Sequence, residues 1–259
     1  MSDLGRQLDD LKAGLQPYHP VCSPSIGGTT LGAAQAFGGR ELICSGRACW
    51  LVETPLASVW ADATPLGLDL AGQLALLDGS ATDLGIRRAL VLDIETGGFS
   101  GFPVFLIGVI ALDAWPLRVV QFLARDYPEE EGILRALVDL CAARDAWVTF
   151  NGKSFDEPFL RDRATLHRVP LPPPRVHVDL LHLARREWRG VLPNCRLSTL
   201  EQEVLGRTRV GDIPSGDVPD LFRHFLRTGN AAPLRPVLEH NRRDLASCVE
   251  LLVRLAATQ

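Results

Sequence analysis

Two acidic residues interrupt a hydrophobic stretch near the middle of the chain. In "LVLDIETGG", residues 90–98, Asp93 and Glu95 stand two positions apart, so they share one face if this stretch is a β-strand. An uncompensated buried charge is costly, so a partner is expected beside them. The candidates are an arginine, a solvent-filled cleft, or a metal ion that further carboxylates hold.

Two later carboxylates are candidate companions. Asp156 ends "TFNGKSFD", between a predicted strand and a predicted helix, and Asp244 ends "EHNRRD" in the last predicted helix, on the same helical face as His240. Four gathered carboxylates could hold two divalent cations that polarise a phosphodiester and activate a water. Oxygen ligands favour Mg²⁺ or Mn²⁺ over Zn²⁺. His240 would then act as a general base or orient the attacking water.

Each acid also has a purely structural explanation. Asp156 could cap the helix that follows it, and Asp244 could be a solvated residue paired with a neighbouring arginine. Asp93 and Glu95 could face water on an exposed sheet. The apolar residues that alternate with this pair weigh against the last explanation, and the metal site accounts for all four acids together.

Small and polar residues beside the acids are candidates for binding a substrate. Thr96 and Gly97 follow Glu95, and their small size would let backbone amides approach a terminal nucleotide. In the later strand-to-helix turn, Asn151 and Lys153 are further candidates, and Lys153 could touch a phosphate. Ordinary turn geometry is the alternative explanation for these residues.

Aromatic and basic residues near the acids suggest contacts with nucleic acid. Phe99 and Phe102 lie in a Gly-rich turn, where they either stack on a base or belong to the core. A group of arginines after the second acidic motif either forms a phosphate track or is merely solvated. Its members are Arg161, Arg163, Arg168, Arg175, Arg185, Arg186, Arg189 and Arg196.

Composition places the 259-residue chain among ordinary globular proteins. It is 46% hydrophobic and 22% charged, and its net charge of -4 gives no global signature of nucleic-acid binding. The polar N-terminus is not a signal peptide, and the longest apolar run, residues 104–112, is too short to span a membrane. We therefore expect a cytoplasmic protein with no membrane partner.

The cysteines lack a close CxxC pair, which predicts free thiols in a reducing compartment. A zinc site made by His19, Cys22, Cys44 and Cys49 is the alternative, although the spacing matches no strong pattern.

The predicted elements after residue 86 have the order of an α/β domain. Three strands with short connections favour antiparallel pairing, and a helix, a strand and further helices follow. We expect strands at 89–95, 104–113, 118–124 and 146–150, helices at 129–143 and 155–168, a strand passing into a helix at 177–188, and a last helix from about Pro233. Ser198 and Glu201 have capping-box spacing and predict another helix start.

Residues 1–85 form a separate N-terminal extension that is Gly-rich and partly irregular, with a possible strand around 48–54. The extension could enlarge the sheet, cover the active site or recruit another protein. Residues 86–259 make up the predicted catalytic domain.

Three ordered motifs carry a family resemblance. "LDIETGG", "FNGKSFD" and "HNRRD" resemble the exonuclease motifs of the DEDD superfamily, and with "VDLLHLARR" and "RLSTLEQEVLG" the chain is most similar to the YprB-type ribonuclease-H-like domain. The resemblance implies a ribonuclease-H-like mixed sheet whose first three strands are antiparallel. It also implies that Asp93, Glu95, Asp156 and Asp244 are metal ligands, and that cleavage runs from a 3′ end.

The last motif departs from the superfamily pattern, which has Tyr four residues or His five residues before the final Asp. Here His240 stands four residues before Asp244, so its role is less well defined than that of the carboxylates.

The expected function is a two-metal, 3′–5′ exonuclease that acts on a single-stranded or frayed 3′ end, with DNA favoured over RNA, in DNA repair or processing. A helicase is a candidate partner. The alternatives are an inactive module that binds nucleic acid or a partner protein, a structure-specific endonuclease, and a metal-dependent phosphatase.

Overall fold

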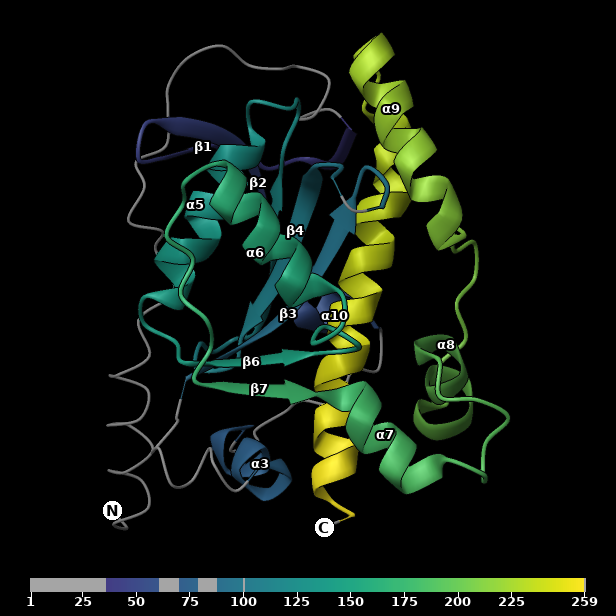
Figure 1. The fold of residues 1–259 in the computed structure, drawn as a ribbon. Coiled ribbons are helices and arrows are strands. Elements are labelled where there is room, and N and C mark those ends of the chain that lie inside the picture. Colours follow the sequence, from purple (N-terminus) through teal and green to yellow (C-terminus); the bar gives the residue numbers. More distant parts are fainter. Residues whose placement is uncertain (1–35, 61–69, 79–87, 100, 259) are drawn as a thin grey trace, which may run out of the picture.

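A computed structural model describes residues 36–60, 70–78, 88–99 and 101–258. Its strands form one seven-stranded sheet in the order β1-β2-β5-β4-β3-β6-β7 (Figure 1). Neighbouring strands from β1 to β3 are antiparallel, whereas β6 and β7 run parallel to β3, which confirms the predicted mixed sheet. The strands are β1 (Arg40–Cys44), β2 (Arg47–Pro55), β3 (Ala89–Thr96), β4 (Val104–Ala111), β5 (Arg118–Leu123), β6 (Ala146–Thr149) and β7 (Val176–Asp179).

Helices cover both faces of this sheet, with α5 and α6 on one face and the long α10 on the other (Figure 1). The α-helices are α3 (Leu70–Leu77), α5 (Glu130–Cys141), α6 (Asp156–Leu166), α7 (Leu180–Trp188), α8 (Leu197–Leu200), α9 (Val218–Thr228) and α10 (Arg235–Ala256). Short helical turns lie at Leu56–Ser58, Glu201–Leu205 (η2), Ser215–Asp217 (η3) and Ala232–Leu234. Within the described ranges, no helix has both the length and the apolar character needed to cross a bilayer.

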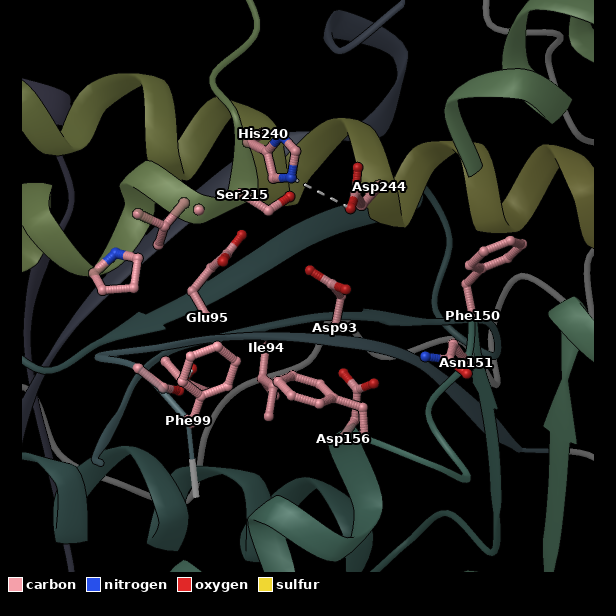
Figure 2. Close-up of a pocket in the computed structure, with 16 residues that line it drawn as sticks. Asp93, Ile94, Glu95, Phe99, Phe150, Asn151, Asp156, Ser215, His240 and Asp244 are labelled. Atoms are coloured by element: carbon pink, nitrogen blue, oxygen red, sulfur yellow. Dashed lines mark hydrogen bonds and ion pairs between the residues drawn. The ribbon is translucent and has the colours of Figure 1, made fainter. Parts of the chain in front are cut away.

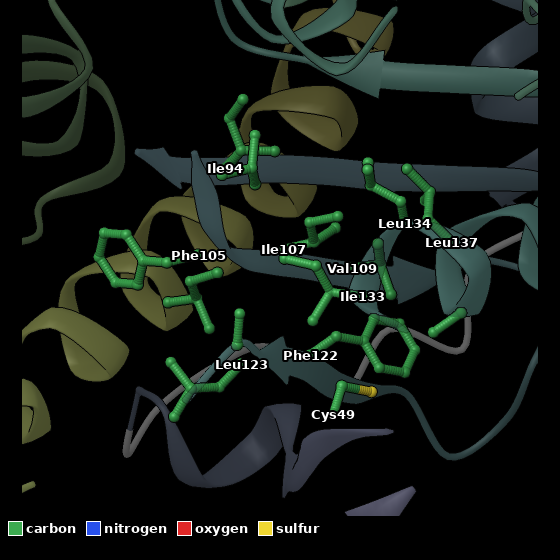
Figure 3. Close-up of a cluster of buried hydrophobic side chains, with 14 of the residues drawn as sticks. Cys49, Ile94, Phe105, Ile107, Val109, Phe122, Leu123, Ile133, Leu134 and Leu137 are labelled. Atoms are coloured by element: carbon green, nitrogen blue, oxygen red, sulfur yellow. The ribbon is translucent and has the colours of Figure 1, made fainter. Parts of the chain in front are cut away.

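Strand β3 separates two apolar cores because its side chains alternate between the two faces. Leu92 and Ile94 pack into the cluster that contains Ile133 of α5, part of which is drawn in Figure 3. Val91 packs into the other cluster, which contains Leu245 of α10. Asp93 and Glu95 continue the face of Val91, so the strand directs both acids toward α10.

The N-terminal strands β1 and β2 lie against β5 and enlarge the sheet, which is one of the three roles that the sequence left open. A Cβ atom at Gly132 of α5 would lie 2.1 Å from the carbonyl oxygen of Ala48, so glycine is required where the helix crosses β2. Cys44 is disulfide-bonded, so the expectation of a free thiol is wrong there, and Cys44 is not a zinc ligand. His19 and Cys22 lie outside the described residues.

The capping-box prediction at Ser198 is also wrong. Helix α8 begins at Leu197, and the side chain of Glu201 binds Ser247 and Arg209 instead of a backbone amide. A long-range ion pair therefore outcompetes the local cap.

Candidate active site

The five residues proposed for catalysis line one cavity of about 430 Å³ between β3, α6 and α10 (Figure 2). They are Asp93, Glu95, Asp156, His240 and Asp244. Among the proposed substrate contacts, Thr96 and Asn151 line the same cavity. Gly97 follows Thr96 and Lys153 lies two residues after Asn151, but neither is among the residues that line the cavity. Lys153 is exposed in the turn that borders the cavity.

Asp156 is attached to the strand that carries the first two acids. It is the first residue of α6 and is only 4% exposed. Its carboxylate accepts hydrogen bonds from its own backbone amide and from the amide of Ile94, which lies between Asp93 and Glu95. The start of α6 is thereby fixed against β3, and Asp156 does more than cap a helix.

A row of polar side chains holds Asp93 from the α10 side. Asn241 donates to the Asp93 carboxylate at 2.7 Å and accepts from Gln121 of β5 at 2.8 Å, while Arg242 donates to Gln121 at 2.8 Å. Gly108 lies between Asp93 and Gln121 in the register of β3, β4 and β5. Because Gly108 has no side chain, Asn241 fits over the middle strand.

The three acids near β3 repel one another. Removal from water, followed by the charges of Asp244, Asp156 and Glu95, raises the pKa of Asp93 well above its ordinary value. Removal from water, followed by the charges of Asp244, Asp156 and Asp212, likewise raises the pKa of Glu95 well above its ordinary value. Burial raises the pKa of Asp156 to about 7, although the two backbone hydrogen bonds oppose this shift. In the described part of the chain, no ion pair involves any of these three carboxylates.

Asp244 has a different environment, because Arg209 forms an ion pair with it. Arg209 lies in the segment between η2 and η3 and also binds Glu201, which is almost fully buried, and Asp212 at 3.0 Å. Burial disfavours the charged guanidinium, but Glu201 and Asp244 hold the pKa of Arg209 above its ordinary value. The partner of Asp244 is thus Arg209 and not one of the arginines beside it in sequence.

His240 connects the two sides of this arrangement. Its Nδ1 lies 2.8 Å from Asp212 Oδ1, and its Nε2 lies 3.7 Å from Asp244 Oδ2 (Figure 2). Arg209 approaches the same Nδ1 at 3.3 Å, a longer contact than that of Asp212. When Nδ1 donates to Asp212, which can only accept, Nε2 is the ring nitrogen that faces Asp244 and the cavity. Burial would raise the pKa of Asp212, but His240 and Arg209 hold it below its ordinary value.

The turn between β6 and α6 is fixed by Asp179 at the end of β7. The Asp179 carboxylate accepts from the backbone amides of Asn151 at 2.8 Å and Lys153 at 3.1 Å, and it also caps α7. Asn151 has a φ of 66°, in the left-handed region. A Cβ atom at Gly152 would lie 2.3 Å from the Thr149 hydroxyl, so only glycine fits. Asp179 therefore supports the turn that carries Asn151.

Comparison with known proteins identifies the family. The family model of the RNase_H superfamily matches residues 90–256, which is more than half of the chain. The chain belongs to the RNase_H superfamily. It is also 35% identical over 185 residues to the uncharacterized protein YprB of Bacillus subtilis (strain 168), which confirms the YprB-type resemblance. That match covers 68% of this chain but only 44% of YprB, so the chain spans less than half of its relative.

A solved structure supports the same fold for this RNase_H-superfamily domain. The family B DNA polymerase from the hyperthermophilic archaeon Pyrobaculum calidifontis aligns with a TM-score of 0.50 and 22% sequence identity. The alignment covers 66% of this chain and 27% of the polymerase. At that identity the likeness concerns the fold alone.

The donor set of the RNase_H-superfamily site suits hard divalent cations, because it consists of carboxylate oxygens that repel one another in a partly buried cavity. The side chains themselves are not drawn together, and in the described ranges no group of three or more His, Cys, Asp or Glu residues has an arrangement ready to hold a metal ion. The Arg209 guanidinium pairs with Asp244, one of these proposed ligands.

Sequence reasoning missed four residues of the site: Asn241, Gln121, Arg209 and Asp212. Asn241 stands inside the "HNRRD" motif, directly after His240. Its place within that motif could have marked it as a candidate site residue. Gln121 was recognisable as a polar residue in the middle of an apolar strand. Nothing in the local sequence distinguishes Arg209 or Asp212 from solvated loop residues.

Proposed function

We propose that this chain is a Mg²⁺- or Mn²⁺-dependent 3′–5′ exonuclease of the DEDD type, with DNA favoured over RNA, acting in DNA repair or processing. The observation that carries the proposal is that carboxylates from β3, α6 and α10, about 150 residues apart in sequence, face one cavity beside His240. Membership of the RNase_H superfamily supports a nuclease-type fold.

Asp93, Glu95, Asp156 and Asp244 would hold the two cations. When bound, such ions stabilise the charge that develops on the phosphodiester and lower the pKa of an attacking water. The residues of the chain do the rest. Asp212 holds the imidazole of His240 so that Nε2 can accept the proton of that water.

The shape of the cavity favours a strand end over a duplex. Its volume of about 430 Å³ suits one or two nucleotides. Phe99 lines it and is 88% exposed, so this ring is available to stack on a base and is not a core residue. A single-stranded or frayed end fits these dimensions, and a strand-separating helicase is a fitting partner.

The test is degradation of a 5′-labelled oligonucleotide, made as DNA and as RNA, with Mn²⁺, Mg²⁺ or EDTA. The proposal expects a metal-dependent ladder that shortens from the 3′ end and is faster for DNA. Cleavage of closed circular DNA would instead assign an endonuclease, and release of phosphate from small phosphoesters alone would assign a phosphatase.

One observation favours a second candidate, an inactive module that binds nucleic acid. The ion pair between Arg209 and Asp244 already neutralises one proposed metal ligand. Binding of oligonucleotides without turnover, at Mn²⁺ concentrations that leave the melting temperature unchanged, would support this module, because a cation that binds the folded state raises its stability.

A further inference from the structure

A second hollow adjoins the candidate active site and has a different lining. It is formed by the end of α7 and the chain that leads into α8, and it comprises two cavities of about 490 and 500 Å³. Both cavities are lined by Arg185, Asn194 and Cys195. Arg196 lines the first and Arg189 the second, and we call this combined surface the arginine groove.

The arginine groove is continuous with the candidate active site. Phe150 and Asn151 line the cavity that holds the carboxylates, and they also line the nearer part of the arginine groove. A nucleic-acid strand whose end lies beside Asp156 can therefore extend past Asn151 to Arg185 along one continuous surface.

The charge of this groove is unbalanced. Arg185, Arg189 and Arg196 are exposed, and none of them forms an ion pair with another described residue. No acidic residue lines either cavity of the groove. Elsewhere in the described structure, Arg163 pairs with Glu130 and Arg125 with Glu41. Three guanidinium groups that form no ion pair with a described residue are suited to phosphate oxygens, which accept their N–H groups in pairs.

The backbone of the groove is ordered by its own hydrogen bonds. Asn194 Oδ1 accepts from the amide of Arg196 at 2.9 Å and from the hydroxyl of Thr199 at 2.7 Å. The amide of Leu192 donates to the carbonyl of Trp188 at 3.0 Å, which closes the turn after Arg189. The arginines are therefore carried by a defined turn.

We propose that the arginine groove binds the phosphodiester backbone of a single nucleic-acid strand, upstream of the nucleotide held in the carboxylate cavity. This inference rests on the proposed function for the direction of the strand, and binding itself needs no catalysis. The groove then makes affinity depend on strand length. A trinucleotide occupies the carboxylate cavity and its border, whereas a 12-mer also contacts the three arginines.

The test compares the triple variant Arg185→Ala, Arg189→Ala, Arg196→Ala with the matched variant Arg40→Ala, Arg47→Ala, Arg118→Ala. The matched variant also loses three arginines, which lie on β1, β2 and β5 toward the opposite edge of the sheet from β7. Arg47 and Arg118 are exposed and Arg40 is partly exposed, and each pairs with a glutamate, so this variant tests the loss of positive charge away from the groove. Binding of a fluorescent 3-mer and 12-mer, as DNA and as RNA, is measured in EDTA between 50 and 200 mM salt.

Three phosphate contacts on a single strand contribute about 2 to the slope of log affinity against log salt, which is an affinity change of about 20-fold over this range. The groove variant is expected to lose that part of the slope and most of the advantage of the 12-mer over the 3-mer. The matched variant is expected to keep both. Equal melting temperatures of the two variants and the unmodified protein show that both are folded.

Cys195 supplies a second readout inside the groove. It is partly exposed, whereas Cys49, Cys141 and Cys248 are buried and serve as internal references. When the 12-mer is present at 10 times its dissociation constant, most molecules are occupied, so alkylation of Cys195 is expected to slow at least about 10-fold. Mass spectrometry of the peptide that contains Cys195 measures the rate.

Two results separate this proposal from the proposed function. If the groove variant keeps the salt slope and length dependence of the unmodified protein, the groove proposal is wrong, whatever the outcome of the cleavage assay. If no metal supports cleavage but the groove variant loses its slope, the groove proposal stands and the exonuclease assignment fails.

Discussion

The two sides of the candidate active site treat their carboxylates in opposite ways. On the strand side, burial and then the charges of Asp244 and Asp156 raise the pKa of Asp93 and of Glu95, and the side chain that binds Asp93 is the neutral amide of Asn241. On the helix side, Arg209 neutralises Asp244. A sheet fixes its side chains through its ladder of hydrogen bonds, so the strand side can hold charges that are left uncompensated.

This difference predicts what divalent cations would do. On the strand side they would relieve repulsion, so binding there would be favoured by electrostatic energy already stored in the fold. On the helix side they would compete with a guanidinium that also pairs with Glu201 and Asp212. Mutations on each side can test these two effects independently.

The largest expected effect is on the strand side. Asp93→Asn should lower the rate of 3′ degradation about 10³-fold, since a proposed metal ligand is lost. The melting temperature in EDTA should not fall, because a neutral amide removes repulsion and its oxygen can still accept from Asn241. Gel assays and thermal unfolding measure the two effects.

The control is Asp220→Asn, an exposed residue of α9 that pairs with Arg223. It should change neither quantity. An Asp93→Asn protein that kept more than a tenth of the activity would remove Asp93 from the proposed ligands.

The next effect is on the helix side. Arg209→Ala should lower the free energy of unfolding by about 3 kcal/mol, because Glu201 would remain buried with an uncompensated charge. Urea denaturation measures this loss. Arg223→Ala removes an exposed ion pair and should cost less than about 1 kcal/mol.

The Arg209→Ala variant also sharpens the comparison between the two sides. If Asp244 is a metal ligand, Mn²⁺ should stabilise this variant more than it stabilises the unmodified protein. A smaller or equal gain would mean that Arg209 does not compete with a cation.

The smallest effect concerns the polar row that holds Asp93. In Gly108→Ala, the new Cβ atom would lie 2.1 Å from Asn241 Oδ1 and 2.7 Å from Leu245 Cδ1. We expect a loss of about 2 kcal/mol in the free energy of unfolding, as is typical of an overfilled core. Gly216→Ala, where nothing lies within 4 Å, is the matched control. Equal stability of the two variants would show that α10 yields easily at Asn241.

Much of the fold could be predicted because its pattern is local. The alternation of apolar residues around Asp93 and Glu95 predicts a strand with both acids on one face, and the structure places them so. Helix α9, in contrast, was not predicted: it begins at Val218, after an irregular stretch, and its 11 residues give only a short amphipathic pattern. Its buried face is determined by packing, as in the stacking of Phe222 on Phe105 at 4.0 Å.

The sequence by itself determined which groups could do chemistry: the three acidic motifs, their order and the elements that carry them. Only the tertiary structure decided how their charges are compensated. Periodicity and turn preferences act within a few residues, whereas Arg209 meets Asp244 35 residues away and Asn241 meets Asp93 148 residues away. Electrostatic pairing depends on distance in space. The partners of these charged groups could therefore be identified only from the structure, in which β3 and α10 lie side by side.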